Sequence, residues 1–369
     1  MEKPSGKERV FGLDAMRAAA ILMVLSSNTF LIYPAGNGLA SQIFALFGFW
    51  GVEVFFVLSG YLVGKILFKV YMQKDFTIHS VFYFLKRLWC STLPNYFLVL
   101  LLNFIVVALV GVEVANSGLY FLFLQNFSTT MLPFFPESWC LSVMQYSYLL
   151  MPFTLFFMSL LVKPKNKNKR FIWVVLVLVF LFIGNKAYYN FTTENLNIDQ
   201  WNIYLKGVVI FRIDAILIGI VASWLSSNYV VFWKNQKNKI AFLGSLFILF
   251  LFIGVGYFRI LIDTNPFFWN VLYLPITSIA FSLFLPVFSQ WESISHWFLK
   301  PVTSVSLISY SIYLLNYSVV LRLMKYYIDT SYFSMNQLHL FAFCYLGIVF
   351  FASYLLYNYF EKPIMDLRG

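Results

Sequence analysis

The first apolar run of the chain carries polar side chains whose spacing could support chemistry. Asp14 and Arg17 lie three positions apart, which is the spacing of an ion pair on one helical face. Asn28 follows Arg17 by eleven positions, close to three helical turns. Both therefore project from one face, with Asn28 about 16 Å further along the axis. Asp14 and Arg17 could form an anion clamp at the mouth of a cavity or merely anchor the helix start. Asn28 could line that cavity or make an interhelical hydrogen bond.

Three more ionisable residues, Glu53, Arg212 and Asp214, lie within or beside apolar runs. Ionisable groups inside a membrane are costly and mark function by default. Arg212 and Asp214 are two positions apart and do not face each other on a helix, so we expect each to have a partner on another helix. Ser59 and Gly60 are small residues and predict a close contact between helices.

The composition indicates which elements must position these residues. The 369 residues are 61% hydrophobic and only 11% charged, with a mean hydropathy of +0.77. Soluble domains carry about 25% charged residues. This excludes a soluble enzyme, a disordered protein and a DNA-binding domain, and it favours a polytopic membrane protein. The cysteines and histidines are dispersed, so we expect no metal site.

Ten apolar stretches are long enough to be read as membrane-spanning helices. We therefore predict an all-α fold of about ten transmembrane helices around a central polar cavity, forming a single domain over residues 1–369. A shorter piece near 118–135 is broken by polar residues and Pro133, and we predict it to be interfacial or re-entrant. The ten stretches are 15–33, 46–68, 93–113, 139–162, 171–186, 205–226, 240–261, 268–289, 302–323 and 338–360.

The basic residues predict the orientation of these helices. With the N-terminus in the cytoplasm, 19 of the 26 lysines and arginines fall in inner segments, including the run Lys163–Arg170. The positive-inside rule demands this asymmetry, and it explains the net charge of +11 without nucleic acid. We expect both termini to be cytoplasmic and the first helix to be uncleaved. The outer segments hold Lys186, Lys206, Arg259, Arg322 and Lys325.

Five separated segments resemble those of the acyltransferase-3 family of integral-membrane acyltransferases. Their order, their spacing and the ten-helix layout extend the resemblance over nearly the whole chain, and Glu361–Pro363 near the end is also similar. The segments are Gly12–Arg17, Phe55–Tyr61, Ser138–Val143 with Tyr148 to Pro152, Arg212–Ala215 with Gly219, and Ser309–Leu314.

The resemblance implies an activity and its partners. Members of the family move an acyl group, often acetyl from acetyl-CoA on the cytoplasmic side, to hydroxyls of surface polysaccharides or lipid-linked sugars. We therefore expect a membrane-bound O-acyltransferase of a bacterial inner membrane. Its donor would be acyl-CoA, its acceptor a glycan or a lipid-linked sugar, and its surroundings membrane lipid. We expect no resident cofactor.

The resemblance also implies roles for individual residues. Arg17, its side chain fixed by Asp14, would hold the phosphates or the carbonyl region of the donor. Asn28 would orient the acceptor hydroxyl or stabilise the oxyanion. The expected substrate-binding residues are Glu53, Ser59, Arg87, Trp139, Arg212, Asp214, Tyr313 and Asn316.

The chain departs from the family pattern at positions that matter for catalysis. The family's signature is a basic residue, ten residues and then a histidine, but Asn28 stands at the histidine position. Met144 and Gln145 stand where the family usually has two acids, and Ser91 where it often has an arginine. Asn316 is a smaller change, since family members have His or Asn there. Acyl transfer to a hydroxyl needs a proton acceptor, worth about 10²–10⁴-fold in rate.

A carboxamide does not titrate near neutrality as imidazole does, so Asn28 cannot replace the base. Glu53 or Asp214 could substitute, but nothing in the sequence places either beside Asn28.

Three hypotheses about the function follow from these observations. The protein is an active acyltransferase, a catalytically silenced relative (natural or engineered) that binds donor or acceptor, or a transporter of a lipid-linked glycan.

Overall fold

The computed structural model describes residues 9–34, 38–111, 114, 116–161, 166–193, 197–292 and 296–366. Over these residues every regular element is helical and no strand occurs, which confirms the predicted all-α class. Part of the basic run, residues 163–165, lies outside the described residues, as do the first lysines of the chain.

Ten long helices and several short ones make up the fold. The long helices are α1 (Phe11–Phe30), α2 (Leu39–Tyr71), α3 (Ile78–Val110), α4 (Trp139–Leu161), α5 (Lys167–Thr192), α7 (Ile213–Asn228), α9 (Lys237–Leu249), α11 (Tyr273–Ser282), α13 (His296–Leu315) and α15 (Met335–Leu356). The short ones are α6 (Ile198–Trp201), α8 (Val230–Asn235), α10 (Val255–Tyr257), α12 (Leu285–Phe288), α14 (Arg322–Tyr327) and α16 (Lys362–Asp366). Single 3₁₀ turns cover Ser117–Leu122, Pro136–Ser138 and Val209–Phe211. Wider π-helical turns cover Asn202–Lys206, Phe250–Gly254, Phe268–Leu272, Asn316–Leu321 and Tyr357–Glu361.

The chain is an integral membrane protein. Within the described residues, 8 helical segments are long and apolar enough to cross a membrane. Each of the ten predicted stretches coincides with a helix, but α1 is more polar than these eight segments, and α7, with 16 residues, is shorter. The eight segments are Leu39–Tyr71, Ile78–Val110, Pro136–Leu161, Lys167–Thr192, Lys237–Tyr257, Phe268–Phe288, Trp297–Tyr327 and Met335–Asp366.

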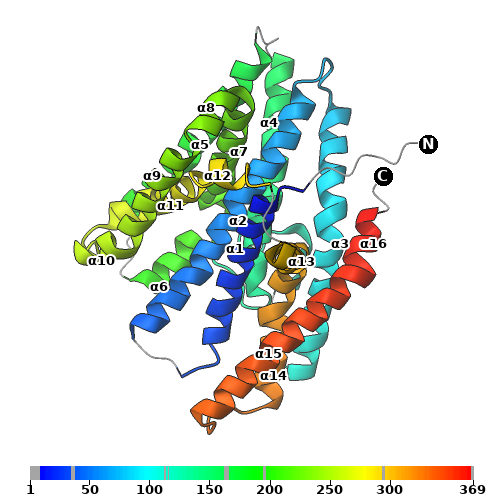
Figure 1. Cartoon of the computed structure of the whole chain (residues 1–369), viewed down its shortest axis with the longest axis vertical. Helices are drawn as coiled ribbons and strands as arrows, with labels where there is room; N and C mark the ends of the chain where they lie inside the picture. The colour runs from blue at the N-terminus through cyan, green and yellow to red at the C-terminus, as the bar shows by residue number, and fades with distance from the viewer. Residues whose placement is uncertain are drawn as a thin grey trace.

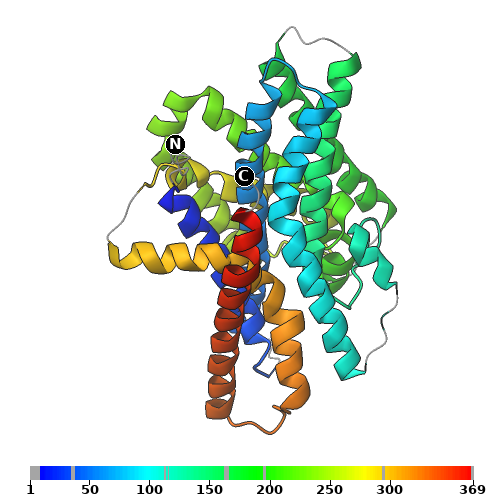
Figure 2. The same cartoon turned by 90° about the vertical axis from the view of Figure 1, so that its right-hand side faces the viewer.

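Several helices are longer than predicted, and one differs in direction. The third stretch begins at Ile78 rather than at 93, because Thr77 and Ser80 form a capping box that starts the helix earlier. The stretch 302–323 is not one straight span. Figure 1 shows α13 end-on, and Figure 2 shows it lying across the direction of α15 before the chain turns along that helix.

The turn after α13 has a local cause at Asn316, where a π-helical turn begins. A π turn leaves backbone carbonyls without their usual amide partners. The Nδ2 atom of Asn316 donates to the carbonyl oxygens of Ile312 and Tyr313, both at 2.8 Å. The side chain thereby satisfies these carbonyls and fixes the bend beside α1 and α3.

Helices α2 and α7 approach closely at two glycines. A Cβ atom on Gly60 would lie 2.1 Å from the carbonyl oxygen of Ile216, and one on Gly219 would lie 2.3 Å from that of Val57. Real Cβ atoms do not come this near to backbone atoms, so only glycine fits. The close helix contact predicted at Ser59 and Gly60 is therefore confirmed for Gly60.

Gly60→Ala is expected to destabilise the protein by about 1–3 kcal/mol, because the helices must separate to admit the methyl group. Gly347→Ala is the matched control, since a Cβ atom there meets nothing within 4 Å. In a helix this control should be neutral or stabilise by about 0.5–1 kcal/mol. Unfolding of both variants in the same detergent measures the difference in stability. Equal effects would show that the close contact at Gly60 does not determine how α2 and α7 pack.

The irregular piece after α3 is partly exposed but is anchored to the protein by a buried asparagine. Its Asn126 side chain is fully buried and donates to the carbonyl oxygens of Gly207 (2.7 Å) and Trp139 (3.1 Å). The amide of Val209 donates to the Asn126 carbonyl in return, at 2.9 Å. The piece is irregular, as predicted, apart from the short helix Ser117–Leu122, and its interfacial or re-entrant position stays a prediction. Its contacts bring the start of α4 next to the residues that precede α7.

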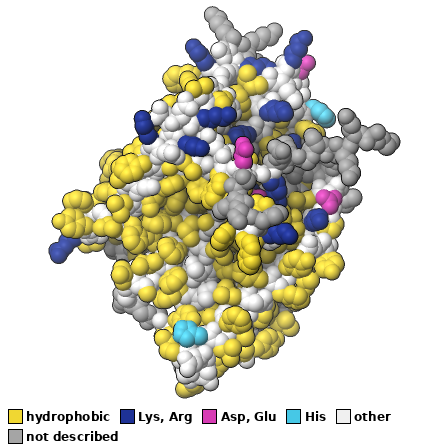
Figure 3. Space-filling model, viewed as in Figure 1, with side chains coloured by type: hydrophobic (Ala, Val, Ile, Leu, Met, Phe, Trp, Pro, Cys, Tyr) yellow, Lys and Arg dark blue, Asp and Glu magenta, His cyan; other side chains and the backbone are white. Residues whose placement is uncertain are grey.

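Basic side chains gather at one end of the molecule. In Figure 3, most of the visible lysines and arginines lie over the upper part, where Figure 1 shows α2 ending and α3 beginning. Helix α1 runs from its first residue, Phe11, away from that end, so its last turns lie toward the opposite end (Figure 1).

Candidate functional site

A pocket of about 400 Å³ opens at the far end of α1. It combines polar side chains with an apolar wall, as ligand sites usually do. Four of the predicted site residues meet here, from the first, fourth and ninth predicted spans. Its lining residues are Val24, Ser27, Asn28, Leu31, Ala45, Gly48, Phe49, Val52, Pro136, Glu137, Trp139, Lys206, Tyr313, Asn316 and Tyr317.

Asn28 and Asn316 form the polar centre of the pocket. The Nδ2 atom of Asn28 donates to the Oδ1 atom of Asn316 at 2.5 Å, and Asn316 is itself fully buried. Both alternatives for Asn28 therefore hold, since it lines a cavity and also bonds across helices. Because Asn316 is fixed by its two backbone carbonyl partners, it orients the Asn28 amide.

Trp139 and Tyr313 form walls of the same pocket. The ring of Trp139 meets that of Phe56 edge-on, with centroids 5.7 Å apart. The hydroxyl of Tyr313 donates to the carbonyl oxygen of Glu137 at 2.9 Å. These contacts hold both aromatic rings in place around the two asparagines.

Two charged residues that the sequence did not assign to the site also line the pocket. Lys206 lines the pocket, with its ammonium 5.5 Å from the ring centroid of Phe49, and its predicted place in an outer segment stays a prediction. Glu137 is buried, and its Oε1 atom accepts from the backbone amide (2.8 Å) and the hydroxyl (2.5 Å) of Ser318. The signal that could have revealed Glu137 is a glutamate within an apolar run, two positions before Trp139.

Asp14 does not form the predicted ion pair with Arg17. Among the described residues, the carboxylate of Asp14 pairs with Arg9, at 2.7 and 3.0 Å, and accepts from Ser306 at 2.8 Å. It therefore does not fix Arg17 by an ion pair, because Arg9 reaches it from the residues before the helix. The pocket residues, as far as the chain is described, include Asn28 but not Arg17.

Arg17 instead lies in a second polar region, nearer the basic end of the molecule. Its charge interacts electrostatically with Asp14, Tyr148 and Glu361. Tyr148 shares a hydrogen bond with Ser59, which places that predicted substrate-binding residue on the Arg17 side. The Oε2 atom of Glu361 accepts from Asn95 at 2.7 Å and from Ser311 at 2.8 Å.

The turn that leads into α4 contacts α13 beside the pocket. Cys140, just after Trp139, is buried and in contact range of the carbonyl oxygen of Glu137 at 3.8 Å. Tyr313 bonds to that same carbonyl from α13. The pocket that Asn28 lines does not include Arg17 within the described residues, so the shared cavity predicted for these two residues is not found there. Arg87 lies half-buried on α3 and does not line the pocket.

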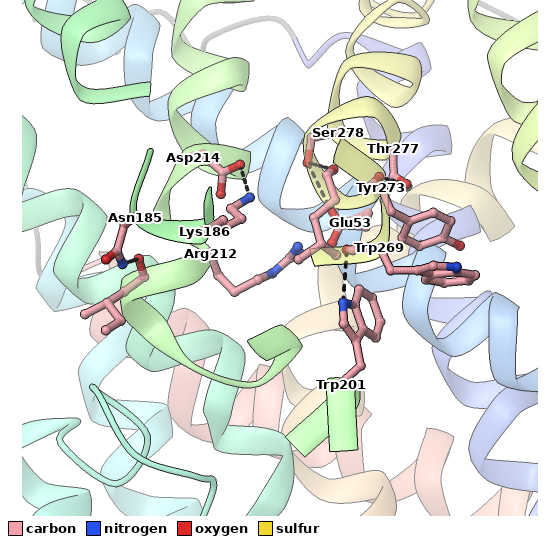
Figure 4. Close-up of polar contacts among 12 residues, drawn as sticks. Glu53, Asn185, Lys186, Trp201, Arg212, Asp214, Trp269, Tyr273, Thr277 and Ser278 are labelled. Atoms are coloured by element: carbon pink, nitrogen blue, oxygen red, sulfur yellow. Dashed lines mark hydrogen bonds and ion pairs between the residues drawn. The ribbon is translucent and has the colours of Figure 1, made fainter. Parts of the chain in front are cut away.

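Two buried ion pairs join α2, α5 and α7 (Figure 4). Arg212 pairs with Glu53, and both side chains are 0% exposed. Lys186 pairs with Asp214 at 2.5 Å. The expectation that Arg212 and Asp214 have partners on other helices is confirmed. The expectation that Lys186 lies in an outer segment is wrong, because α5 continues to Thr192.

Because of these ion pairs, neither Glu53 nor Asp214 is available as a free base. Glu53 additionally accepts from the hydroxyl of Ser278 at 2.9 Å. Each acid is held by a cation, and neither lines the pocket. Their position favours a structural role that ties three helices together.

Lys186→Met is expected to destabilise the protein by about 3–5 kcal/mol, because it leaves the Asp214 carboxylate buried without its cation. The double variant Lys186→Met with Asp214→Leu removes both charges and should recover most of that loss. A double-mutant cycle in detergent, read by thermal unfolding, checks this. Additive single effects would show that the two charges are not coupled.

Comparison with models of known protein families identifies the family of this chain. A model of the acyltransferase-3 family, described as an acyltransferase domain, matches residues 10–358. The chain belongs to the acyltransferase-3 family. No curated protein and no solved structure matched it. Membership in the acyltransferase-3 family indicates acyltransferase activity in general, and the matched residues contain the pocket, Arg17 and the two buried ion pairs of Glu53 and Asp214.

Proposed function

We propose that this acyltransferase-3 protein transfers an acyl group, acetyl in the simplest case, from acyl-CoA to a hydroxyl of a surface glycan or lipid-linked sugar. The observation that carries the proposal is the pocket, in which Asn28, Asn316, Glu137 and Lys206 place polar and charged groups inside an apolar membrane protein. Such groups are costly in a membrane unless they serve a substrate or structure.

The distribution of charge supports an orientation for the two substrates. The basic end of the molecule faces the cytoplasm in this proposal, as the positive-inside rule requires, so both termini are cytoplasmic in a bacterial inner membrane. The anionic donor then approaches from the end nearer to Arg17. The acceptor enters the pocket at the other end of α1, where Asn28 lies.

In this proposal Asn28 and Lys206, which both line the pocket, stabilise the oxyanion that forms when the acceptor attacks. An amide nitrogen carries two hydrogens, so Nδ2 of Asn28 can donate to Asn316 and to a substrate oxygen at the same time. Donors already fixed before reaction are worth more than donors that must be reoriented. Asn316 thus acts as a positioning residue for Asn28 in this proposal.

Transfer of label from acetyl-CoA tests the proposal. Membranes that contain the protein, supplied with radiolabelled acetyl-CoA, are expected to release labelled glycan or lipid, and membranes without it are not. Binding of acetyl-CoA by the purified protein without transfer would instead indicate a silenced relative, which the asparagine at the family's histidine position favours. Movement of a lipid-linked glycan across liposomes without acyl donor would indicate a transporter.

A further inference from the structure

We propose that Glu137 accepts the proton of the acceptor hydroxyl, the task that Asn28 cannot perform. This inference rests on the proposed acyl transfer and goes beyond it by assigning the base. It uses a residue outside the segments that carry the family resemblance.

One oxygen of the Glu137 carboxylate accepts hydrogen bonds and the other has no partner within the described residues. Its Oε1 atom takes both hydrogen bonds from Ser318, while its Oε2 atom has no hydrogen-bond partner within the described part of the chain. The residue is only 8% exposed, yet it lines the pocket together with Asn28 and Asn316. A buried carboxylate oxygen without a partner is costly. An acceptor hydroxyl bound in the pocket would supply the missing donor.

Other buried acids of the described chain are already engaged or lie elsewhere. Glu53 pairs with Arg212, Asp214 with Lys186, and Asp14 with Arg9, while Glu361 accepts from Asn95 and Ser311. Glu137 differs from all four because it lines the pocket.

One cation lines the pocket together with Glu137, and a second interacts with Glu137 electrostatically. Lys206 lines the same pocket. Arg322 interacts electrostatically with Glu137 and donates to the carbonyl oxygens of Phe134 (2.9 Å) and Pro133 (3.2 Å), just before it in the chain. Neither cation forms an ion pair with Glu137 within the described residues, so the buried Oε2 atom keeps an unused position for a hydrogen-bond donor.

The chemical step balances with these groups alone. The acceptor oxygen attacks the thioester carbon, and its proton passes to Oε2 of Glu137. The carbon–sulfur bond then breaks, and the leaving thiolate takes up a proton, which Glu137 can return. The products are an ester and free coenzyme A, and Glu137 is again ionised.

Glu137→Gln tests this assignment. The amide keeps an oxygen for both Ser318 bonds, so the fold should persist, but it cannot accept a proton at the free position. Turnover of acetyl-CoA should fall about 10²–10⁴-fold, with little change in the KM for acetyl-CoA or in thermal unfolding. Ser318→Ala, which keeps the carboxylate but removes one of its two bonds, should cost much less turnover.

Rescue separates a base from a merely structural residue. Adding Asn28→His to Glu137→Gln should restore turnover, since it places a titrating group in the same pocket. Full activity of Glu137→Gln beside an active wild type would overturn the inference and leave the proposed function intact. A wild type that binds acetyl-CoA and transfers no label would overturn the proposed function itself.

A chemical measurement covers the case in which Glu137→Gln does not fold. Wild-type protein is treated with dicyclohexylcarbodiimide, which reacts with carboxyl groups in apolar surroundings, and the modified residues are identified by mass spectrometry. Modification at Glu137 should stop acetyl transfer. Transfer that continues at the wild-type rate with Glu137 modified would overturn the inference, as would a Glu137 that the reagent cannot reach.

Discussion

Asn28→His, combined with Met144→Glu, is expected to raise the turnover of acetyl-CoA. The resemblance to the family places a histidine at this position, and the structure shows a geometry that would orient it. An imidazole N–H can replace the Asn28 amide as the donor to Oδ1 of Asn316, which leaves the other ring nitrogen as a proton acceptor facing the pocket.

The size of this gain depends on whether another base is present. With Glu137 intact the gain should be modest, and in the Glu137→Gln background it should approach about 10²–10⁴-fold. The rate of label transfer from acetyl-CoA measures both. Asn28→Ala, which adds no base and removes the donor to Asn316, is the control and should not raise turnover. A histidine at this position that has no effect in either background would show that the pocket is not where the acyl group is transferred.

Arg17→Ala is expected to have the largest effect on use of the donor. In our proposal its guanidinium holds phosphate or carbonyl oxygens of acyl-CoA, and removing one partner of a buried, charge-assisted contact costs about 2–5 kcal/mol. This corresponds to a loss of about 30- to 5,000-fold in kcat/KM for acetyl-CoA. Arg17→Lys keeps the charge but not the planar fork of donors, so it should recover only part of the loss.

A surface lysine provides the matched control for charge. Lys239 is exposed on α9, and no ion pair or side-chain hydrogen bond involves it within the described residues, so Lys239→Ala should leave kcat/KM unchanged. Thermal unfolding of each variant separates loss of function from loss of fold. If Arg17→Ala and Lys239→Ala behave alike, Arg17 has no part in binding the donor.

The helices of this protein could be predicted from the sequence because their cause is local. Apolar runs interrupted by polar loops determine where helices form, and each predicted stretch coincides with one. The broken piece at 118–135 was recognised as irregular for the same reason. The direction of α13 could not be predicted in this way. It depends on a π-helical turn that Asn316 stabilises, and hydropathy does not report the axis along which a helix lies.

The partners of buried charges could be predicted only in part. Spacing showed that Arg212 and Asp214 do not face each other, but Glu53 is 159 positions away from Arg212 and only the fold brings them together. Lys186 was misassigned because it ends an apolar run and so looks like a flanking residue. Hydropathy could not show that the helix continues past it or that Asp214 neutralises its charge.

Site residues that lie on one helix or in a family segment could be predicted from the sequence. Site residues that only the fold brings together could not. Asn28 was recognised from its depth on α1, and Trp139, Tyr313 and Asn316 from family resemblance, and all four line one pocket. Glu137 and Lys206 lie beside them through the fold of irregular segments, which neither periodicity nor motifs describe. Asp14 pairs with Arg9 rather than with Arg17, because the segment before α1 brings the Arg9 guanidinium to the Asp14 carboxylate.

The most direct test of the account is whether donor reaches the pocket at Asn28. In a chain whose three native cysteines are changed to serine, Asn28→Cys is treated with a water-soluble thiol reagent, with and without acetyl-CoA. Leu22→Cys, on the exposed outer side of α1, is the comparison. The account predicts that the cysteine at position 28 reacts, that acetyl-CoA slows its reaction, and that the cysteine at position 22, facing lipid, stays inert. Equal inertness at both positions, or reaction at position 28 that acetyl-CoA leaves unchanged, would contradict it.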